Sequence, residues 1–253
     1  MKSLYLVLFA ALALYSCSKI YTPVLFHQDI AYMPKPASFD SLSTQVYASI
    51  GGGVRPDAYF RDEMYSGQAN LSVGHHFNNF NLAYGGFAEF GDYKSGAQNS
   101  GDPNYFSDRT FGAVGGRLSA NLYKRINHAD FRYIGFEAAY SHEFGDFTTF
   151  KRTLKPESNY YIDPRVNLFT VGLTSEVIFY LANNMNLHHG IRLFVGTTLG
   201  HNQLNSTINK DDEAQDRVFR EVFPKFSYFI NYKHIFGIVD VGSGFMGRLG
   251  YRF

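Results

Sequence analysis

The chain ends with the stretch IVDVGSGFMGRLGYRF, which runs from Ile238 to Phe253. Side chains on an extended strand alternate between its two faces. One face of this stretch is apolar and aromatic, and it comprises Val239, Val241, Phe245, Leu249, Tyr251 and Phe253. The other face combines glycine with isolated charges and comprises Asp240, Gly242, Gly244, Met246, Arg248, Gly250 and Arg252. Such a face suits the inside of a small closed barrel better than a surface covered by water.

The same alternation recurs along the chain, separated in turn by short turns and by long polar loops. The candidate strands before the last one are residues 44–55, 63–77, 80–92, 109–124, 131–144, 166–181, 189–202 and 218–235. Nine is an odd number, whereas bacterial membrane barrels have an even number of strands. Either one candidate lies outside the barrel or a strand is hidden, for example within residues 218–253. The sequence therefore predicts an all-β fold, an antiparallel up-and-down transmembrane β-barrel of eight or ten strands.

Composition indicates which solvent meets the apolar face. The mean hydropathy is −0.20, and after the first twenty residues no apolar run approaches the roughly 20 residues that a membrane helix needs. Only helices and closed barrels satisfy all backbone groups inside lipid. The chain contains 25 Phe, 19 Tyr and 24 Gly but no Trp, and the abundance of Phe, Tyr and Gly fits a barrel with aromatic girdles.

The polar face of the strands consists mostly of Ser, Gly, Asn and Thr. A water-covered surface carries roughly 25–35% charged residues, which is far more than this face has. We therefore expect the apolar face to meet lipid. A soluble lipocalin-like barrel, which alternates in the same way, is the alternative fold.

The amino terminus has the pattern of a secretory signal peptide. Lys2 precedes the apolar run 4–14, and we assign residues 1–16 to the signal. Residues 17–43 contain three prolines and no sustained alternation, so we expect a lipid-anchored tether there. Residues 44–253 form the predicted barrel domain.

Cys17 is the only cysteine, so it cannot form an internal disulfide. The sequence Leu-Tyr-Ser-Cys that ends at Cys17 resembles a bacterial lipobox, with Tyr15 in place of the usual small residue. The resemblance implies diacylglycerol on the Cys17 sulfur and an acyl chain such as palmitate on its amine. Ser18 follows, which implies an anchor in the periplasmic leaflet of the outer membrane. An ordinary cleaved signal with an incidental cysteine is the alternative.

The final strand resembles the last strand of bacterial outer-membrane β-barrels, whose terminal Phe is read by the barrel assembly machinery. This implies that Phe253 is the assembly signal, that outer-membrane lipid and the assembly machinery are partners, and that the protein lies in the outer membrane of a Gram-negative bacterium. The whole pattern is similar to small outer-membrane barrel lipoproteins of the Bacteroidota type, a resemblance that supplies no activity.

Six charges fall at similar heights on the polar face in the middle of the strands, and most neighbouring strands carry opposite signs. They are Glu89, Arg117, Glu137, Glu176, Arg192 and Arg248. We expect them to form a belt of ion pairs that closes the lumen, because an unpaired buried charge is costly. The belt could be a gate or a substrate site, but a packed polar core is the simpler interpretation, since side chains fill small barrels.

The sequence offers little for catalysis. His142 and Ser175 lie on the apolar face, as the catalytic His and Ser do in outer-membrane lipid deacylases and phospholipases, but they are expected about five residues apart in height. The adjacent pairs His75-His76 and His188-His189 point to opposite faces. We therefore predict no catalytic residue, no cofactor and no metal site, and the net charge of +1 gives no reason to expect nucleic acid.

These observations predict a lipid-anchored outer-membrane barrel with a structural or interaction role. It would display its long loops outward and offer its proline-rich arm to a possible periplasmic protein partner. The alternatives are a narrow pore or small-solute transporter, an outer-membrane lipid-modifying enzyme, and a soluble lipocalin-like ligand-binding lipoprotein.

Overall fold

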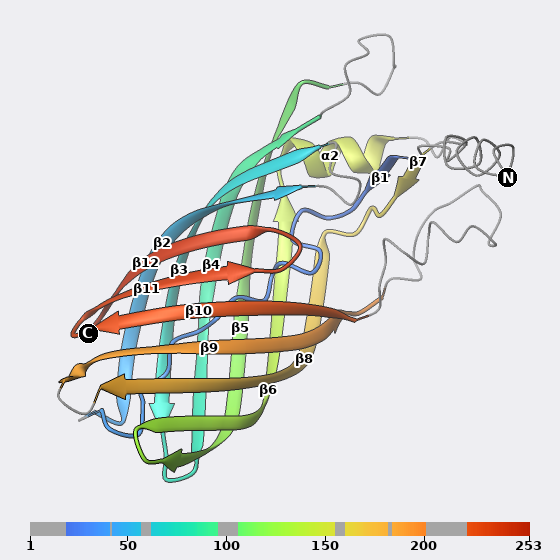
Figure 1. The fold of residues 1–253 in the computed structure, drawn as a ribbon. Coiled ribbons are helices and arrows are strands. Elements are labelled where there is room, and N and C mark those ends of the chain that lie inside the picture. Colours follow the sequence, from blue (N-terminus) through green and yellow to red (C-terminus); the bar gives the residue numbers. More distant parts are fainter. Residues whose placement is uncertain are drawn as a thin grey trace, which may run out of the picture.

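The fold is a closed antiparallel β-barrel of ten strands (Figure 1). The computed structural model describes residues 19–40, 42–56, 62–95, 106–154, 160–181, 184–200 and 222–253. The barrel strands are β2 (Thr44–Pro56), β3 (Glu63–His76), β4 (Phe80–Lys94), β5 (Asp108–Ile126), β6 (Ala129–Phe144), β8 (Asn167–Leu181), β9 (Asn184–Thr198), β10 (Phe223–Tyr232), β11 (Ile235–Val241) and β12 (Phe245–Arg252). Sequence neighbours pair throughout, and β12 closes the barrel on β2. The prediction of an eight- or ten-stranded up-and-down barrel is confirmed, with ten strands.

The tenth strand was hidden in the carboxy-terminal stretch. Residues 238–253 are not one strand, because the chain reverses at residues 242–244 between β11 and β12, and Val241 lies opposite Phe245. The preceding turn is at Lys233-His234, whereas candidate strands ending at residue 235 and beginning at residue 238 had placed it at residues 236–237. Since Val241 and Phe245 are four positions apart, the alternation of faces continues in phase across the turn. The pattern therefore gave no sign of the reversal.

The barrel is apolar outside and largely polar inside, as predicted. Leu71 is 60% exposed and Leu249 is 63% exposed on the outer face, where Phe136 and Ile50 are also exposed. An apolar surface that encircles a barrel requires an apolar solvent. The barrel therefore spans a membrane, and the soluble lipocalin-like alternative, whose apolar side chains would converge inside, is wrong.

The two ends of the barrel differ. The strand ends that flank the long connections lie at one end, which we call the loop end, where the turn at residues 242–244 also lies; they are Pro56 and Glu63, Lys94 and Asp108, Phe144 and Asn167, and Thr198 and Phe223. The turns at residues 77–79, 127–128 and 233–234 and the strand ends Leu181 and Asn184 lie at the other, the turn end, together with Phe253. The loop 145–166 contains α2 (Asp146–Thr153) and β7 (Tyr160–Ile162). No helix in the described part of the chain is long and apolar enough to cross a bilayer.

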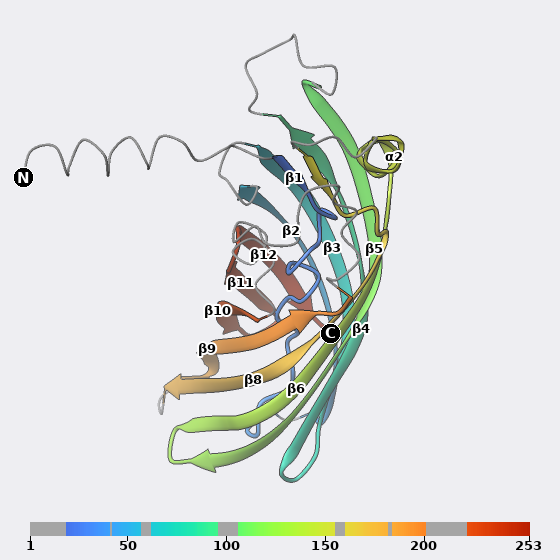
Figure 2. The same ribbon diagram turned by 90° about the vertical axis from the view of Figure 1, so that its right-hand side faces the viewer.

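The segment before β2 passes through the inside of the barrel. β1 (Lys19–Tyr21) pairs in parallel with β7 at the loop end, and residues 22–40 then descend through the lumen to the turn end, where β2 begins (Figures 1 and 2). Most side chains of this segment are buried. We call residues 22–40 the plug. The predicted tether 17–43 is thus corrected over its described part, while Cys17, the signal peptide and the lipobox lie outside the described residues.

An aromatic cluster covers the plug at the loop end. Phe147 of α2 stacks on Tyr93 of β4, with ring centroids 4.1 Å apart, and both rings pack near Tyr21. The helix begins at Asp146 and carries Lys151 and Arg152 in its last turn, charges that suit the helix dipole. The loop end is therefore built as a packed cap on the lumen.

A compact closed barrel should resist unfolding by detergent. We expect the Cys17→Ser protein to extract only with detergent and to migrate differently on electrophoresis before and after boiling, because the strands stay paired until heated. The Cys17→Ser change removes any contribution of an acyl anchor to extraction. Identical migration of unheated and boiled samples, with release into buffer, would contradict a membrane-spanning barrel.

The plugged lumen as candidate functional site

Twelve charged side chains of the barrel strands are buried, and among the described residues the two signs balance. The six cations are Arg55, Arg117, Arg132, Arg192, Lys225 and Arg248. The six carboxylates are Glu89, Asp130, Glu137, Glu143, Glu176 and Asp240. All six residues of the predicted belt belong to this set. Their burial follows from alternation, because each lies on the inward face of its strand.

Only one ion pair forms between two members of the predicted belt. Arg192 of β9 contacts Glu137 of β6, with its Nε donating to Glu137 Oε1 at 3.1 Å. Three of the other four belt residues pair with charges that the sequence analysis did not select, and Arg117 forms no ion pair with a described carboxylate. Glu176 pairs with Arg132 at 2.8 Å, Arg248 with Asp240 at 2.6 Å, and Glu89 with Arg55.

Four arginines of the wall donate to the backbone of the plug, and one of them is Arg55, whose Nη1 donates to Val24 O at 3.3 Å. Arg117 Nε donates to Asp29 O at 2.5 Å, Arg132 Nη2 to Pro36 O at 2.9 Å and Arg248 Nη2 to Tyr32 O at 2.9 Å. The plug has no strand partner over this length, and a buried carbonyl without a partner is costly. The arginines thus supply the hydrogen bonds that a neighbouring strand would otherwise provide.

Side chains of the plug also bind the wall. The Tyr32 hydroxyl donates to Glu176 Oε1 at 2.6 Å, and the Tyr32 ring stacks on Phe229 with centroids 4.5 Å apart. Lys35 Nζ donates to Ser119 at 2.8 Å and lies 3.7 Å from Glu176 Oε2. Several strands therefore hold the plug at this depth of the lumen, through both polar and apolar contacts.

The upper end of the plug is fixed by Glu143. Val24 N donates to Glu143 Oε2 at 2.6 Å, while Lys151 of α2 pairs with Glu143 Oε1 at 2.9 Å. Burial lowers the pKa of Lys151, and the neighbouring Glu143 opposes that shift. One carboxylate thus joins the plug to the helix of the loop end.

The lower end of the plug is fixed by two further carboxylates. Asp130 of β6 accepts a hydrogen bond from Ser38 N at 2.6 Å. Arg252 of β12 pairs with Asp40 at 2.9 Å. Phe253, the predicted assembly signal, is exposed nearby, and its backbone N donates to Val46 O at 3.0 Å.

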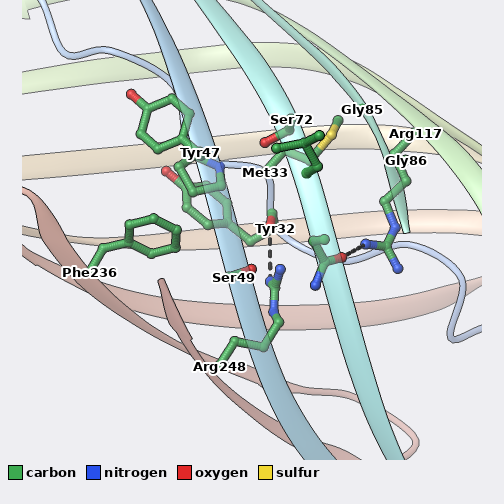
Figure 3. A pocket seen from close by; sticks show the side chains of 13 residues that line it. Tyr32, Met33, Tyr47, Ser49, Ser72, Gly85, Gly86, Arg117, Phe236 and Arg248 are labelled. Atoms are coloured by element: carbon green, nitrogen blue, oxygen red, sulfur yellow. Dashed lines mark hydrogen bonds between the residues drawn. The ribbon is translucent and has the colours of Figure 1, made fainter. Parts of the chain in front are cut away.

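Little free space lies beside the plug at mid-depth. A cavity of about 10 Å³ is bounded by the plug and by strands β2 to β5, β11 and β12 (Figure 3). Such a volume holds about one water molecule. The arrangement is therefore suited to closing the barrel and to holding a very small ligand.

The structure does not bring His142 and Ser175 together. His142 pairs with Asn167 of β8, eight residues along that strand from Ser175, which corresponds to roughly 26 Å at about 3.3 Å per residue. The His142 ring bonds to Asn167 Oδ1 at 2.8 Å, and Ser175 Oγ contacts Arg132 O at 3.4 Å. In the described ranges, no group of three His, Cys, Asp or Glu side chains is arranged to hold a metal ion.

The plug is the functional element that sequence reasoning missed. Its signal was composition, because a solvated tether is poor in large apolar residues, whereas this segment contains Val24, Leu25, Ile30, Tyr32 and Met33, all buried. Arg132 and Asp240 were missed for another reason. They lie near strand ends, outside the mid-strand level at which charges were compared.

Comparisons with known proteins give similarity of shape without an assigned family. No protein-family model and no curated protein matches the sequence. Among solved structures, an outer membrane channel from Pseudomonas putida F1 is 10% identical, with 87% of this chain and 99% of that chain covered and a TM-score of 0.42. The outer membrane protein OprG from Pseudomonas aeruginosa is 12% identical, with 83% and 96% covered and a TM-score of 0.34.

The transport unit of the autotransporter AIDA-I from Escherichia coli is 8% identical, with 88% of this chain and 94% of that chain covered and a TM-score of 0.41. Values below 0.5 are too low for these similarities to bear on function. The fold and the membrane assignment rest on the chain's own strand pairing and surface.

Loss of one partner of the buried Glu137–Arg192 pair should be strongly destabilising. Arg192→Met leaves Glu137 buried without its cation, which should cost about 3–5 kcal/mol of the free energy of unfolding in lipid. The double variant Glu137→Leu/Arg192→Met removes both charges and should recover most of this loss. Denaturant titration of the purified protein in bilayers measures the free energy of unfolding of both variants. A free energy of unfolding of Arg192→Met within about 0.5 kcal/mol of wild type would contradict a buried pair.

Proposed function

We propose that the protein is a sealed barrel of the outer membrane of a Gram-negative bacterium, with a structural or interaction role exercised through its loop end. The observation that carries the proposal is the plug, whose backbone is bound by arginines of the wall along the lumen. A conducting barrel needs a continuous polar path. Here the plug and its ion pairs occupy that path.

The neutral lumen also supports a closed barrel. Ion-selective pores present rings of one charge sign to the permeating ion, whereas the buried charges of these strands balance and are mostly paired. Moving an ion through would require separating pairs that are already desolvated. This interior fits a barrel that anchors its loop end at the membrane surface better than it fits a barrel that conducts ions.

The lipid anchor proposed on Cys17 would lie at the loop end. Residues 19–21 pair with β7 there, only two residues after Cys17 in the sequence. Short turns face the periplasm in barrels of this kind, so the loop end would face outward and the acyl chains would enter the outer leaflet. This proposal replaces the periplasmic leaflet and the free periplasmic arm expected from sequence.

A gated pore is the second candidate. The observation in its favour is that the contacts of residues 22–40 with the wall are hydrogen bonds, ion pairs and ring contacts, which could be released without breaking a covalent bond. Release of the plug would leave a polar lumen. Replacing an arginine that binds the plug therefore distinguishes a sealed barrel from a gated pore.

Conductance of single barrels in planar bilayers is the direct test. We expect wild type and Arg132→Ala to be silent, because the plug retains its remaining bonds to Arg117, Arg248 and Glu143. Arg125→Ala, which removes a cation bonded to Tyr180 at the turn end, is the matched control. Openings in Arg132→Ala that are absent from the control would overturn the sealed barrel in favour of the gated pore.

Acylation of Cys17 is tested separately. Cells fed a labelled fatty acid should label the wild-type protein, and Cys17→Ser should abolish the label while the barrel still folds. A protease site inserted after Ser18 should be cut in intact cells, because the anchor lies outside. Cleavage only after the outer membrane is permeabilised would place residue 18 in the periplasm and contradict the proposed orientation.

A further inference from the structure

The cavity beside the plug is lined by hydrogen-bond donors of the wall. Its lining includes Tyr32 and Met33 of the plug, Asn70 of β3, Arg117 of β5 and Arg248 of β12. The two arginines enter it from different parts of the barrel wall (Figure 3). The cavity is therefore a place where the plug and six wall strands meet, and three of these strands supply the donors Asn70, Arg117 and Arg248.

Three donor nitrogens at this cavity are buried without a partner among the described residues. They are Arg117 Nη2, Arg248 Nε and Asn70 Nδ2. Arg117 is only 6% exposed and Arg248 only 5%. A buried donor that bonds to nothing is costly, and buried donors of this kind are usually satisfied by a bound water or ion.

The cavity also carries an excess of positive charge. Arg117 forms no ion pair with a described carboxylate, and its polar partners are Asp29 O at 2.5 Å and Asn70 Oδ1 at 2.6 Å. Its guanidinium stacks on the Phe87 ring, 3.8 Å from the centroid, which fixes its position.

Charges around Arg117 do not cancel that excess. Arg248 is close enough to repel it, whereas Asp29, Glu89 and Asp240 attract it without pairing with it. Asp240 is already paired with Arg248, and Glu89 with Arg55. The guanidinium of Arg117 is thus the cation of this region whose charge is least compensated.

Glycine makes room for this arrangement. A side chain at Gly51 of β2 would have its Cβ 2.6 Å from Arg248 Cγ. The absence of a side chain at Gly51 therefore lets Arg248 cross into the lumen between β12 and β2. The position of the Arg248 guanidinium thus depends on a glycine at position 51 of the neighbouring strand.

We propose that this cavity binds a small monatomic anion of the size of chloride, held by Arg117, Arg248 and Asn70. A volume of about 10 Å³ suits one particle of the size of water, and is too small for phosphate or sulfate. The anion accepts the three unpartnered N–H groups and offsets the repulsion between the guanidiniums. Because Arg117 and Arg248 also bind plug carbonyls, the anion would stabilise the seated plug.

Bromide replaces chloride and is visible by its anomalous scattering. Crystals of the full mature protein grown with bromide should show an anomalous peak among Arg117, Arg248 and Asn70. Arg117→Gln, which keeps a polar side chain without the charge, should lose this peak. Arg252→Gln removes a cation paired with Asp40 at the turn end and should retain it. A site without anomalous density in wild type would overturn the proposal in favour of a bound water.

A stability measurement keeps the proposal testable if Arg117→Gln does not fold. Wild-type protein in neutral detergent is heated in chloride or in gluconate at equal ionic strength, and the loss of the folded band on electrophoresis is followed. A ligand that binds only the folded state raises the midpoint in proportion to the logarithm of its concentration once the site is saturated. A midpoint that is higher in chloride, in wild type and in Arg252→Gln alike, supports the site, and equal midpoints in both salts overturn it.

Discussion

The rest of the structure depends on one constraint, which is that a backbone polar group inside a membrane must find its partner within the protein. The ten strands meet this constraint by pairing with one another around a closed ring. The plug cannot meet it in the same way, because Pro23, Pro34 and Pro36 lack a donor and interrupt any regular pairing. Its backbone is therefore bound by side chains of the wall.

This requirement explains why arginine dominates the cationic part of the lumen. A guanidinium has five donors in a planar fork, so it can bind a carboxylate and a carbonyl together. Arg132 does so with Glu176 and Pro36 O, and Arg248 does so with Asp240 and Tyr32 O. Each such arginine neutralises a buried carboxylate and also donates a hydrogen bond to a carbonyl of the plug. Lysine, as a point charge, would do this less well.

The sequence predicted the architecture because alternation is a local property. The residues of each strand show which of its faces is apolar. The contact of Leu71 and Leu249 with lipid could therefore be inferred without knowing which strands lie beside them. The strand count could not be obtained in this way, since the turn at residues 242–244 preserves the phase of the alternation. The belt residues are buried on the inner face, but their partners depend on strand tilt and register, which no single segment encodes.

The plug could not be placed from sequence for a related reason. It has no periodicity, and its contacts with β5, β6, β8 and β12 join residues far apart in the chain. Its apolar composition was the available indication that it is not a solvated linker. The prolines were interpreted as the sign of an extended arm, whereas they lie in a segment whose carbonyls accept hydrogen bonds from side chains of the wall.

The position of the closing seam has a consequence for biogenesis. The ring is completed when β12, the last strand made, pairs with β2, and the segment enclosed by that ring is synthesised before any of its strands. Residues 22–40 fill this ring with large side chains such as Tyr32 and Phe39, and the aromatic cluster covers them at the loop end. We therefore expect this segment to pack against the nascent sheet while the seam is still open, so that membrane insertion and packing of the lumen are coupled.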